Sequence, residues 1–284
     1  MPQYLLAMTI FGTIGLFVRF IDLPSEMIAL ARGGIGALFL FLIIRLLGKR
    51  LDRSAIRRNF PALFIGGAAL GFNWIFLFEA FQRTRIASAT LAYYMTPIII
   101  ILLSPVVLRE RVSAFKMCCA ATALFGMSLI SGIWSGDAPE IDGILMGLIA
   151  ACFYSTLVFA NKFLKDIGPY DTSSMQLSLS ACVLLPYVLF STDFSSFSPD
   201  TTSILFAVVV AVLHTGVAYG LYFSAIPKLE AARIAIFSFV DPAVAIILSI
   251  FVLGEAMTTA GIIGAVLILG AALASELVGL KKAA

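Results

Sequence analysis

The chain has 284 residues, of which 61% are hydrophobic and only 12% are charged, and its mean hydropathy is +1.05. Soluble globular chains are nearer half apolar and a quarter charged, so this composition excludes a water-soluble domain and predicts a protein whose solvent is lipid. The formal net charge of +3 is small, and we interpret it as a signal of membrane topology and not as evidence for nucleic acid.

Ten apolar segments are each long enough to cross a bilayer, which takes about 20 helical residues because the hydrocarbon layer is about 30 Å thick. They lie at residues 4–21, 25–47, 60–81, 86–108, 114–133, 143–161, 172–190, 203–225, 232–253 and 259–280. The segments lack the alternating polarity of barrel strands, and open sheets would leave backbone groups unpaired in lipid. The sequence therefore predicts an all-α membrane protein with ten transmembrane helices.

The two halves of the chain are related. Residues 71–126 align without a gap on residues 216–271, and the shared positions include Gly71/Gly216, Pro97/Pro242, Ser104/Ser249 and Glu110/Glu255. Ten spans divide into two sets of five, and an odd number per half makes the second repeat enter the membrane inverted. We therefore expect one transport domain made of a first repeat over residues 1–134 and an inverted repeat over residues 135–284.

Positive charges gather on one side of this topology. The loops after the even-numbered spans and the C-terminal segment hold most of the cations, which are Arg45, Lys49, Arg50, Arg53, Arg57, Arg58, Arg109, Arg111, Lys116, Lys162, Lys165, Lys228, Arg233, Lys281 and Lys282. The opposite side holds only Arg19, Arg83 and Arg85. Because cytoplasmic loops are enriched in Lys and Arg, we expect a multi-pass protein of the cell (inner) membrane with both termini in the cytoplasm.

Motifs for common enzymatic chemistry are absent from the sequence. It has no G-x-x-x-x-G-K-[ST], no H-E-x-x-H and no G-x-S-x-G, so ATP hydrolysis and intramembrane proteolysis have no visible carrier. The four cysteines fall inside predicted spans, where they act as small apolar residues. We expect neither a metal site, nor a cofactor, nor an enzymatic activity.

Small residues mark faces for close helix packing. Gly33-Gly34-x-Gly36 and Gly66-Gly67-x-x-x-Gly71 both lie within predicted helices, where such patches let backbones approach closely. A similar face on the last span contains Gly261, Gly264, Ala265 and Ala271. It suits packing within the chain and association into a homodimer equally well.

Pro97 and Pro242 predict kinks halfway across the membrane. Each removes a helix N–H and displaces the carbonyl four residues earlier, so the carbonyls of Tyr93 and Ser238 need new donors. Interrupted helices at corresponding positions of two halves point to a substrate site in transporters. A kink that serves packing alone is the alternative interpretation.

Ionisable residues inside spans are the second pointer, because a charge at mid-membrane costs about 2.5–3.5 kcal/mol. Asp241 is the deepest of these residues, and its repeat counterpart is the uncharged Thr96. This asymmetry suits a role of Asp241 in binding substrate or a proton. Arg32 and Glu79 lie in the outer parts of the second and third spans, as a candidate charge relay or as a structural pair. His214 lies near the middle of the eighth span and suits either a polar cavity or packing.

Rings and polar groups near the membrane middle complete the candidate substrate site. Its predicted members are Asn73, Trp74, Tyr93, Tyr94, Thr96, Tyr154, His214, Tyr222, Phe237 and Asp241. Tyrosine and tryptophan tips need hydrogen-bond partners there, so a cavity with this lining would accept a small amphipathic solute. Each ring taken singly also fits core packing.

Several motifs resemble the EamA-type family of the drug/metabolite transporter superfamily. They are Ala7-x-x-x-Phe11-Gly12 with Arg19, Ala151-x-x-Tyr154-Ser155 with Lys162, Thr96-Pro97…Leu108-Arg109-Glu110-Arg111, and Asp241-Pro242…Leu253-Gly254-Glu255. The resemblance implies an inverted-repeat carrier that moves small metabolites by alternating access, often as an exporter. It also implies a central cavity walled mainly by the first, third, fourth, sixth, eighth and ninth spans.

The residues and the resemblance together favour a secondary transporter. The leading cargo is an amino acid or similar zwitterion, whose ammonium meets Asp241 and whose carboxylate meets Asn73, a tyrosine or Arg32. A cationic or nucleoside-linked metabolite in an aromatic cavity is the alternative. A channel or a lipid scramblase would need a continuous polar pore or groove, for which the spans hold few polar groups. Protons are a candidate coupling ion through Asp241, and Glu110 and Glu255 are expected to cap or pair at helix ends.

Overall fold

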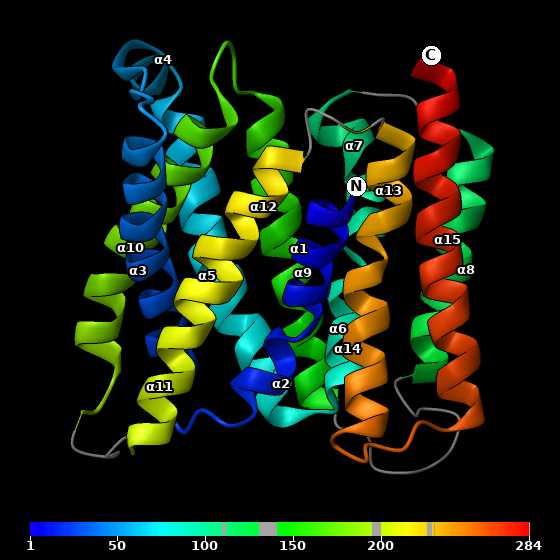
Figure 1. The fold of residues 1–284 in the computed structure, drawn as a ribbon. Coiled ribbons are helices and arrows are strands. Elements are labelled where there is room, and N and C mark those ends of the chain that lie inside the picture. Colours follow the sequence, from blue (N-terminus) through cyan, green and yellow to red (C-terminus); the bar gives the residue numbers. More distant parts are fainter. Residues whose placement is uncertain (110–111, 131–140, 195–199, 226–228, 230, 284) are drawn as a thin grey trace.

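The computed structural model describes the chain except for residues 110–111, 131–140, 195–199, 226–228, 230 and 284. The described residues form helices and no strand, and Met1 lies at the same end of the bundle as the end of the last helix (Figure 1). The elements are α1 (Pro2–Gly12), α2 (Ile14–Val18), α3 (Ser25–Leu46), α4 (Arg53–Arg58), α5 (Phe60–Arg83), α6 (Ile86–Tyr93), α7 (Thr96–Val107), α8 (Ala114–Ile130), α9 (Ile141–Lys162), α10 (Pro169–Ser191), α11 (Thr201–Val209), the π-helix η1 (Val210–Val217), α12 (Ala218–Ala225), α13 (Ala231–Ser238), α14 (Val240–Phe251) and α15 (Thr259–Ala283).

Six of these helical segments are long and apolar enough to cross a membrane. They are Ser25–Leu46, Phe60–Arg83, Ile86–Val107, Ile141–Lys162, Pro169–Ser191 and Thr201–Tyr222. Shorter apolar helices cover Pro2–Val18, Ala114–Ile130, Ile236–Phe251 and Thr259–Ser275, where the sequence predicts the other four spans. Large apolar side chains face outward, with Phe190 92% and Leu38 71% exposed, as expected for a surface that contacts lipid. The chain is thus an all-helical, multi-pass membrane protein, while the count of ten spans remains a prediction.

The first and eighth spans are not the continuous helices that the sequence predicts. The first breaks at Thr13, whose hydroxyl donates to the Ile10 carbonyl at 2.7 Å, and α2 ends at Val18. The eighth passes from α11 through η1 into α12. Neither break lies at a proline, so hydropathy and proline positions gave no signal for them. The structure also contains α4, a short helix after α3 whose N-cap Asp52 accepts from the Ala55 amide at 3.0 Å.

Helix α5 lies near the centre of the bundle and packs against α3, α9 and α10 (Figure 1). Its glycines allow the close approach to α10. A Cβ added at Gly67 would lie 2.7 Å from the Leu179 Cβ, and one added at Gly71 would lie 2.9 Å from the Ser180 Oγ. The Gly66–Gly71 patch therefore serves helix packing, as the sequence predicts.

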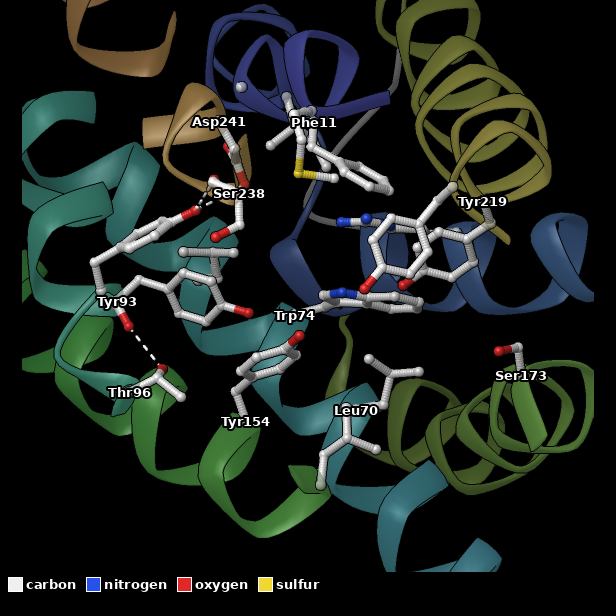
Figure 2. Close-up of a pocket in the computed structure, with 18 of the residues that line it drawn as sticks. Phe11, Leu70, Trp74, Tyr93, Thr96, Tyr154, Ser173, Tyr219, Ser238 and Asp241 are labelled. Carbon is white, nitrogen blue, oxygen red and sulfur yellow. Dashed lines mark hydrogen bonds between the residues drawn. The ribbon is translucent and has the colours of Figure 1, made fainter. Parts of the chain in front are cut away.

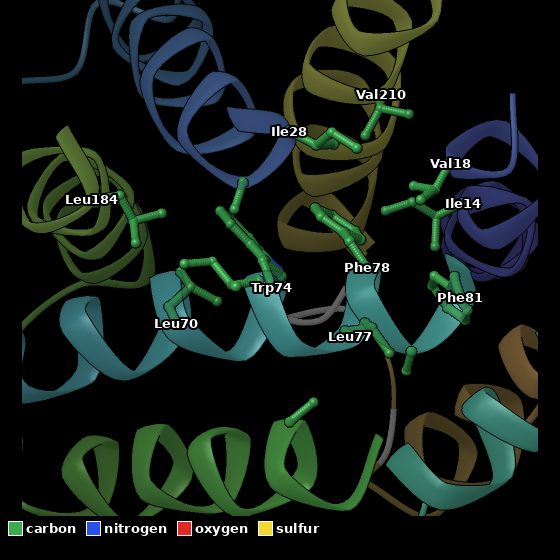
Figure 3. Close-up of a cluster of buried hydrophobic side chains, with 14 of the residues drawn as sticks. Ile14, Val18, Ile28, Leu70, Trp74, Leu77, Phe78, Phe81, Leu184 and Val210 are labelled. Atoms are coloured by element: carbon green, nitrogen blue, oxygen red, sulfur yellow. The ribbon is translucent and has the colours of Figure 1, made fainter. Parts of the chain in front are cut away.

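The main apolar core surrounds the same helix (Figure 3). Buried rings and aliphatic side chains from α5 meet residues of α2, α3, α10 and η1, and the cluster includes Ile14, Val18, Ile28, Leu70, Trp74, Leu77, Phe78, Phe81, Leu184 and Val210. Because lipid tails are as apolar as these side chains, the helices are held by close packing and not by removal from water. A rigid core at this place positions one wall of the site described below.

Helices α8 and α15 lie side by side at one edge of the bundle (Figure 1). Their contact is a glycine crossing, because a Cβ at Gly264 would lie 2.5 Å from the Gly126 carbonyl oxygen. Part of the small face of the last span thus packs within the chain. Gly270 on the same helix has open space around it. A homodimer through α15 stays a prediction.

Candidate functional site

A cavity of about 580 Å³ lies inside the bundle (Figure 2). This volume falls within the range of clefts that hold small organic ligands. The family resemblance implies walls from the first, third, fourth, sixth, eighth and ninth spans, and residues of all six line it. The structure adds the second span through Arg32 and the seventh through Thr172, Ser173 and Gln176.

Most of the candidate site residues predicted from the sequence meet on the wall of this cavity. Those that line it are Arg32, Trp74, Tyr93, Tyr94, Thr96, Pro97, Tyr154, Tyr222 and Asp241. Figure 2 shows Trp74, Tyr93, Tyr154 and Asp241 arranged around one open space. Their binding of a substrate remains a prediction.

The lining also contains aromatic residues that the sequence prediction missed. Tyr4, Phe11 and Tyr219 belong to it. The Phe11 ring lies 5.6 Å from that of Tyr219, and the Tyr4 ring lies 5.5 Å from that of Tyr222. Tyr219 could have been found, because it lies one helical turn before Tyr222 and so shares its face. Tyr4 lies near the start of the chain, where no pattern distinguishes a lining ring from a packing ring.

Five predicted site residues lie outside the described lining: Asn73, Glu79, His214, Phe237 and Pro242. Asn73 is fully buried and its Nδ2 donates to the Ala150 carbonyl at 2.8 Å, so this side chain joins α5 to α9. Phe237 packs with the apolar cluster around Tyr4. Pro242 is buried in the first turn of α14, directly after Asp241.

His214 does not line the described cavity, and it contacts the first span where α1 ends and α2 begins. It is fully buried, and its Nε2 lies 2.9 Å from the Thr13 Oγ1, where the backbone passes from α1 to α2. The Phe17 ring covers it at a centroid distance of 5.1 Å. The described contacts thus favour a positioning role for His214 at this break over direct contact with a solute.

The structure does not join Arg32 to Glu79. Glu79 accepts from the Ser25 hydroxyl at 2.9 Å and pairs with Arg83 one turn along α5, at 2.5 Å between Oε1 and Nη2. Arg32 donates from Nε to the Thr215 Oγ1 at 2.9 Å. Within the described contacts, no hydrogen bond or ion pair links the two side chains, so Glu79 belongs to one end of α5 and Arg32 belongs to the cavity.

The helix breaks in the fourth and ninth spans fall just before the two prolines. Helix α6 ends at Tyr93 and α7 begins at Thr96, while α13 ends at Ser238 and α14 begins at Val240. The freed carbonyls find new donors, as the sequence predicts. The Tyr93 carbonyl accepts from the Thr96 hydroxyl at 2.7 Å, and the Ser238 carbonyl accepts from the Tyr94 hydroxyl at 3.3 Å (Figure 2).

Asp241 lies in the first turn of α14, where the positive end of the helix dipole favours a carboxylate. Its Oδ2 accepts from the Tyr94 hydroxyl at 3.2 Å, so one phenol bridges the acid and the freed carbonyl of Ser238. Gly12 packs on the same turn, because a Cβ there would lie 2.5 Å from the Asp241 carbonyl oxygen. The interrupted first and ninth spans therefore touch beside the acid.

Arg32 is 5% exposed and lines the cavity from α3. Its Cζ lies 4.3 Å from the centroid of the Trp74 ring, a cation–π contact, and 5.8 Å from that of Phe78. The bond to Thr215 uses only Nε, and the described residues supply no other hydrogen bond to the guanidinium. Its remaining N–H groups are available to an anionic group in the cavity.

Two adjacent residues of the π-helix η1 contact different helices. His214 reaches Thr13 at the break of the first span, whereas Thr215 reaches Arg32 on α3. Gly36 of α3 packs on Thr215, and its lack of a side chain leaves room for the contact. π-helical segments inside α-helices occur frequently at functional sites.

The end of the bundle near Arg19 is bridged by a polar network, which we call the Arg19–Glu255 clasp. The Arg19 guanidinium pairs with the Glu255 carboxylate and donates to the Thr84 carbonyl at 3.1 Å. Glu255 also accepts from the Ile86 amide at 2.8 Å and from the Ser249 hydroxyl at 2.6 Å. Glu255 thus caps and pairs at a helix end, as the sequence predicts, while Glu110 lies outside the described residues.

The end of the cavity opposite the Arg19–Glu255 clasp is open to the surface. Lining residues there include Asn161 and Pro169, which are both exposed, so the cavity reaches the surface between α9 and α10. Helices α1 and α15 have their outer ends on this same side (Figure 1). In the part of the chain that the structure describes, no group of three or more His, Cys, Asp or Glu residues could hold a metal ion.

Known proteins resemble this chain over most of its length. A model of the EamA-like transporter family matches residues 3–132 and 141–275. The uncharacterized transporter YxxF of Bacillus subtilis (strain 168) is 30% identical over 249 residues, which are 87% of this chain and 79% of that protein. An uncharacterized transporter of Archaeoglobus fulgidus is 28% identical over 230 residues, 81% of each chain. A protein of known crystal structure shares the fold at a TM-score of 0.66 and 22% identity, with 97% of this chain and 96% of that chain covered.

Proposed function

The chain belongs to the EamA-like transporter family, and we propose that it carries small zwitterionic metabolites, most simply amino acids, across the membrane by alternating access. One observation carries the proposal: among the described residues that line the cavity, the charged ones are Arg32 and Asp241, and they are opposite in sign. In this proposal ten spans form two inverted repeats, residues 1–134 and 135–284, as one transport domain. The family match in each half of the chain supports that division.

The two charges suit a zwitterion better than an ion of either sign. Isolated charges are costly at membrane depth, so each side chain gains from an opposite charge on the solute. Arg32 offers free N–H groups to a carboxylate, and Asp241 offers an acceptor to an ammonium group. They come from α3 and α14, which lie on different sides of α5 and α1 (Figure 1). A zwitterion meets both, whereas a monovalent ion would meet one and be repelled by the other.

A cationic metabolite is the second candidate, and the cavity supports it less well. The face of Trp74 already holds the Arg32 guanidinium at 4.3 Å, and that charge repels another cation. Tyr93, Tyr154 and Tyr222 still offer aromatic surface, so amines and nucleosides belong in the test. The described lining contains no feature that favours a channel or a lipid scramblase over a carrier.

Two features at the ends of the cavity support alternating access. The lining reaches exposed residues near Asn161, while the Arg19–Glu255 clasp bridges the other end. In the proposed mechanism the kinked fourth and ninth spans, with the first and sixth, pivot to open one end at a time. In this proposal the open end, which carries the positive loops, faces the cytoplasm of an inner-membrane protein, and the positive-inside rule supports that orientation. A site loaded from the cytoplasm suits export.

Asp241 is the residue through which protons would couple to transport. It is the acid of the described lining, and it touches the interrupted first span at Gly12. A change in its protonation would alter both the charge offered to the ammonium group and the hydrogen bond from Tyr94. Without such coupling, the same site describes a facilitator.

Counterflow in proteoliposomes tests the proposal. Vesicles loaded with an unlabelled amino acid should take up the labelled one with saturation, while amines and nucleosides should compete weakly. Arg32→Gln should lose most of this uptake, because the carboxylate loses its charged partner. Arg45→Gln is the matched control, since Arg45 is an exposed arginine of the same helix. Uptake that fails to saturate, or exchange of amines without amino acids, would overturn the proposal.

A further inference from the structure

We propose that the cavity contains a second binding position, formed by the side chains of Asn161 and Gln176, that recognises a neutral amide on the substrate. We call these two residues the amide pair. The inference rests on the proposed function as a carrier of zwitterions. It adds a substrate class: a zwitterion that bears a carboxamide at the end away from its charged head.

The amide pair has one nitrogen donor atom and one oxygen acceptor atom left for a ligand. Gln176 Nε2 donates to Asn161 Oδ1 at 2.6 Å, which uses one polar atom of each amide. Gln176 Oε1 and Asn161 Nδ2 have no partner within the described part of the chain. If the two amides exchanged roles, one donor and one acceptor would still remain. A donor beside an acceptor matches the C=O and N–H of an amide.

The pair faces the cavity, and its surroundings are neutral. Gln176 is 5% exposed and lines the cavity, so its side chain is covered from lipid. Thr172 and Ser173 add hydroxyl groups to the same wall. Among the described lining residues at this end, none is charged. A neutral polar group is therefore the ligand that this end selects.

Two glycines of α5, Gly66 and Gly67, leave room for Gln176. A Cβ at Gly66 would overlap the Gln176 Nε2, and one at Gly67 would lie 2.9 Å from the Gln176 carbonyl oxygen. Glycine is a poorer helix former than alanine, so these positions favour the approach of α10 over local helix stability. A hydrogen bond between α9 and α10 could also serve packing alone. Packing alone would not require the two amides to line the cavity or to leave groups unused.

The separation between the Arg32 guanidinium and the amide pair follows from their contacts on α5. The guanidinium lies over Trp74, with 4.3 Å from Cζ to the ring centroid, and Gln176 Nε2 lies against Gly66. Trp74 follows Gly66 by eight residues, or about 12 Å at 1.5 Å per residue. An extended glutamine with a hydrogen bond of about 2.9 Å at each end has a comparable length, so it can reach both groups.

Competition with two matched probes in the counterflow assay tests the amide pair. L-glutamine and L-methionine have the same zwitterionic head and similar length, but only glutamine has an amide. Gln176→Leu and Asn161→Leu should each weaken competition by glutamine about fivefold, the effect of one hydrogen bond, and change competition by methionine less than twofold. Ser178→Ala is the control on α10, because Ser178 bonds the Ser174 carbonyl and lies outside the described lining.

The outcomes separate this inference from the proposed function. Competition by methionine also shows that each variant is folded and active. If the two leucine variants weaken both probes equally, or neither, the amide pair is not a binding position and the zwitterion carrier stands. If the wild-type protein exchanges no zwitterion of the panel, the proposed function fails and the amide pair fails with it.

Discussion

Replacing Arg19 by glutamine should open the end of the cavity that the Arg19–Glu255 clasp now bridges. Arg19 follows α2, while Glu255 follows α14 and also holds the first amide of α6. The clasp thus connects segments that must separate if this end is to open. Arg19 Nη2 makes both contacts, and glutamine lacks the charge and is too short to place a donor at that position, so it cannot bridge Glu255 and Thr84 as the guanidinium does.

The size of the effect follows from the contacts and their exposure. A hydrogen bond to a charged group contributes about 1.5–3 kcal/mol when it is buried. Here the Arg19 side chain is 30% and the Glu255 side chain 13% exposed, so water weakens the pair. We expect the closed form of this end to lose about 1–2 kcal/mol, which is roughly a 5- to 30-fold shift toward the open form.

Cysteine labelling measures this shift. Ala245 is 4% exposed and lines the cavity. Ala245→Cys, in a protein without its native cysteines, therefore reports whether a membrane-impermeant maleimide can enter the cavity from the Arg19 side. The labelling rate should rise about 5- to 30-fold with Arg19→Gln, in line with that population shift. Arg83→Gln is the matched control, because Arg83 lies on the same side but pairs with Glu79 within α5. Equal rates in the two variants would refute the idea that the clasp holds this end closed.

Three further substitutions test separate parts of the structure. Asp241→Asn should weaken uptake, because the ammonium group loses its charged partner, and should make the remaining flux independent of pH, because the proton-binding group is lost; wild-type flux that does not respond to pH would instead identify a facilitator. Tyr94→Phe should lower the thermal unfolding midpoint, because the Ser238 carbonyl loses its donor at a cost of about 1–3 kcal/mol; an unchanged midpoint would show that this bond contributes little. Gly264→Leu should also lower the midpoint, by the roughly 1–3 kcal/mol typical of overpacking, since it collides with Gly126; Gly270→Leu, with nothing within 4 Å, should not, and equal effects of the two would contradict the glycine crossing.

The breaks of the fourth and ninth spans show how far local sequence reasoning reaches. Proline removes a specific N–H, so the sequence predicts both kinks and the carbonyls that they free. It also predicts that these carbonyls need donors, and Thr96 supplies one within a single turn. The other donor, the Tyr94 hydroxyl, comes from 144 positions away. No local pattern could identify it, because it depends on how two helices cross.

Asn73 and Trp74 show why the predicted site list was less accurate than the predicted helices. They are neighbours in sequence and at the same depth, but successive helical residues point about 100° apart. Trp74 therefore faces the cavity, while Asn73 faces α9 and bonds Ala150. In the same way Arg32 pairs with Thr215, which η1 turns toward it, and not with Glu79. Depth in the membrane can be read from sequence, but the direction of a side chain around its helix cannot.

The sequence by itself determined that this chain is helical, embedded in lipid and interrupted at Pro97 and Pro242, because hydropathy and the missing proline N–H are properties of short segments. Tertiary structure alone decided that Arg32, Asp241 and the amide pair share one cavity, and that Arg19 closes on Glu255. Those facts depend on the rotation and crossing of helices far apart in the chain, and in lipid these are decided by the fit of small and large side chains across each contact.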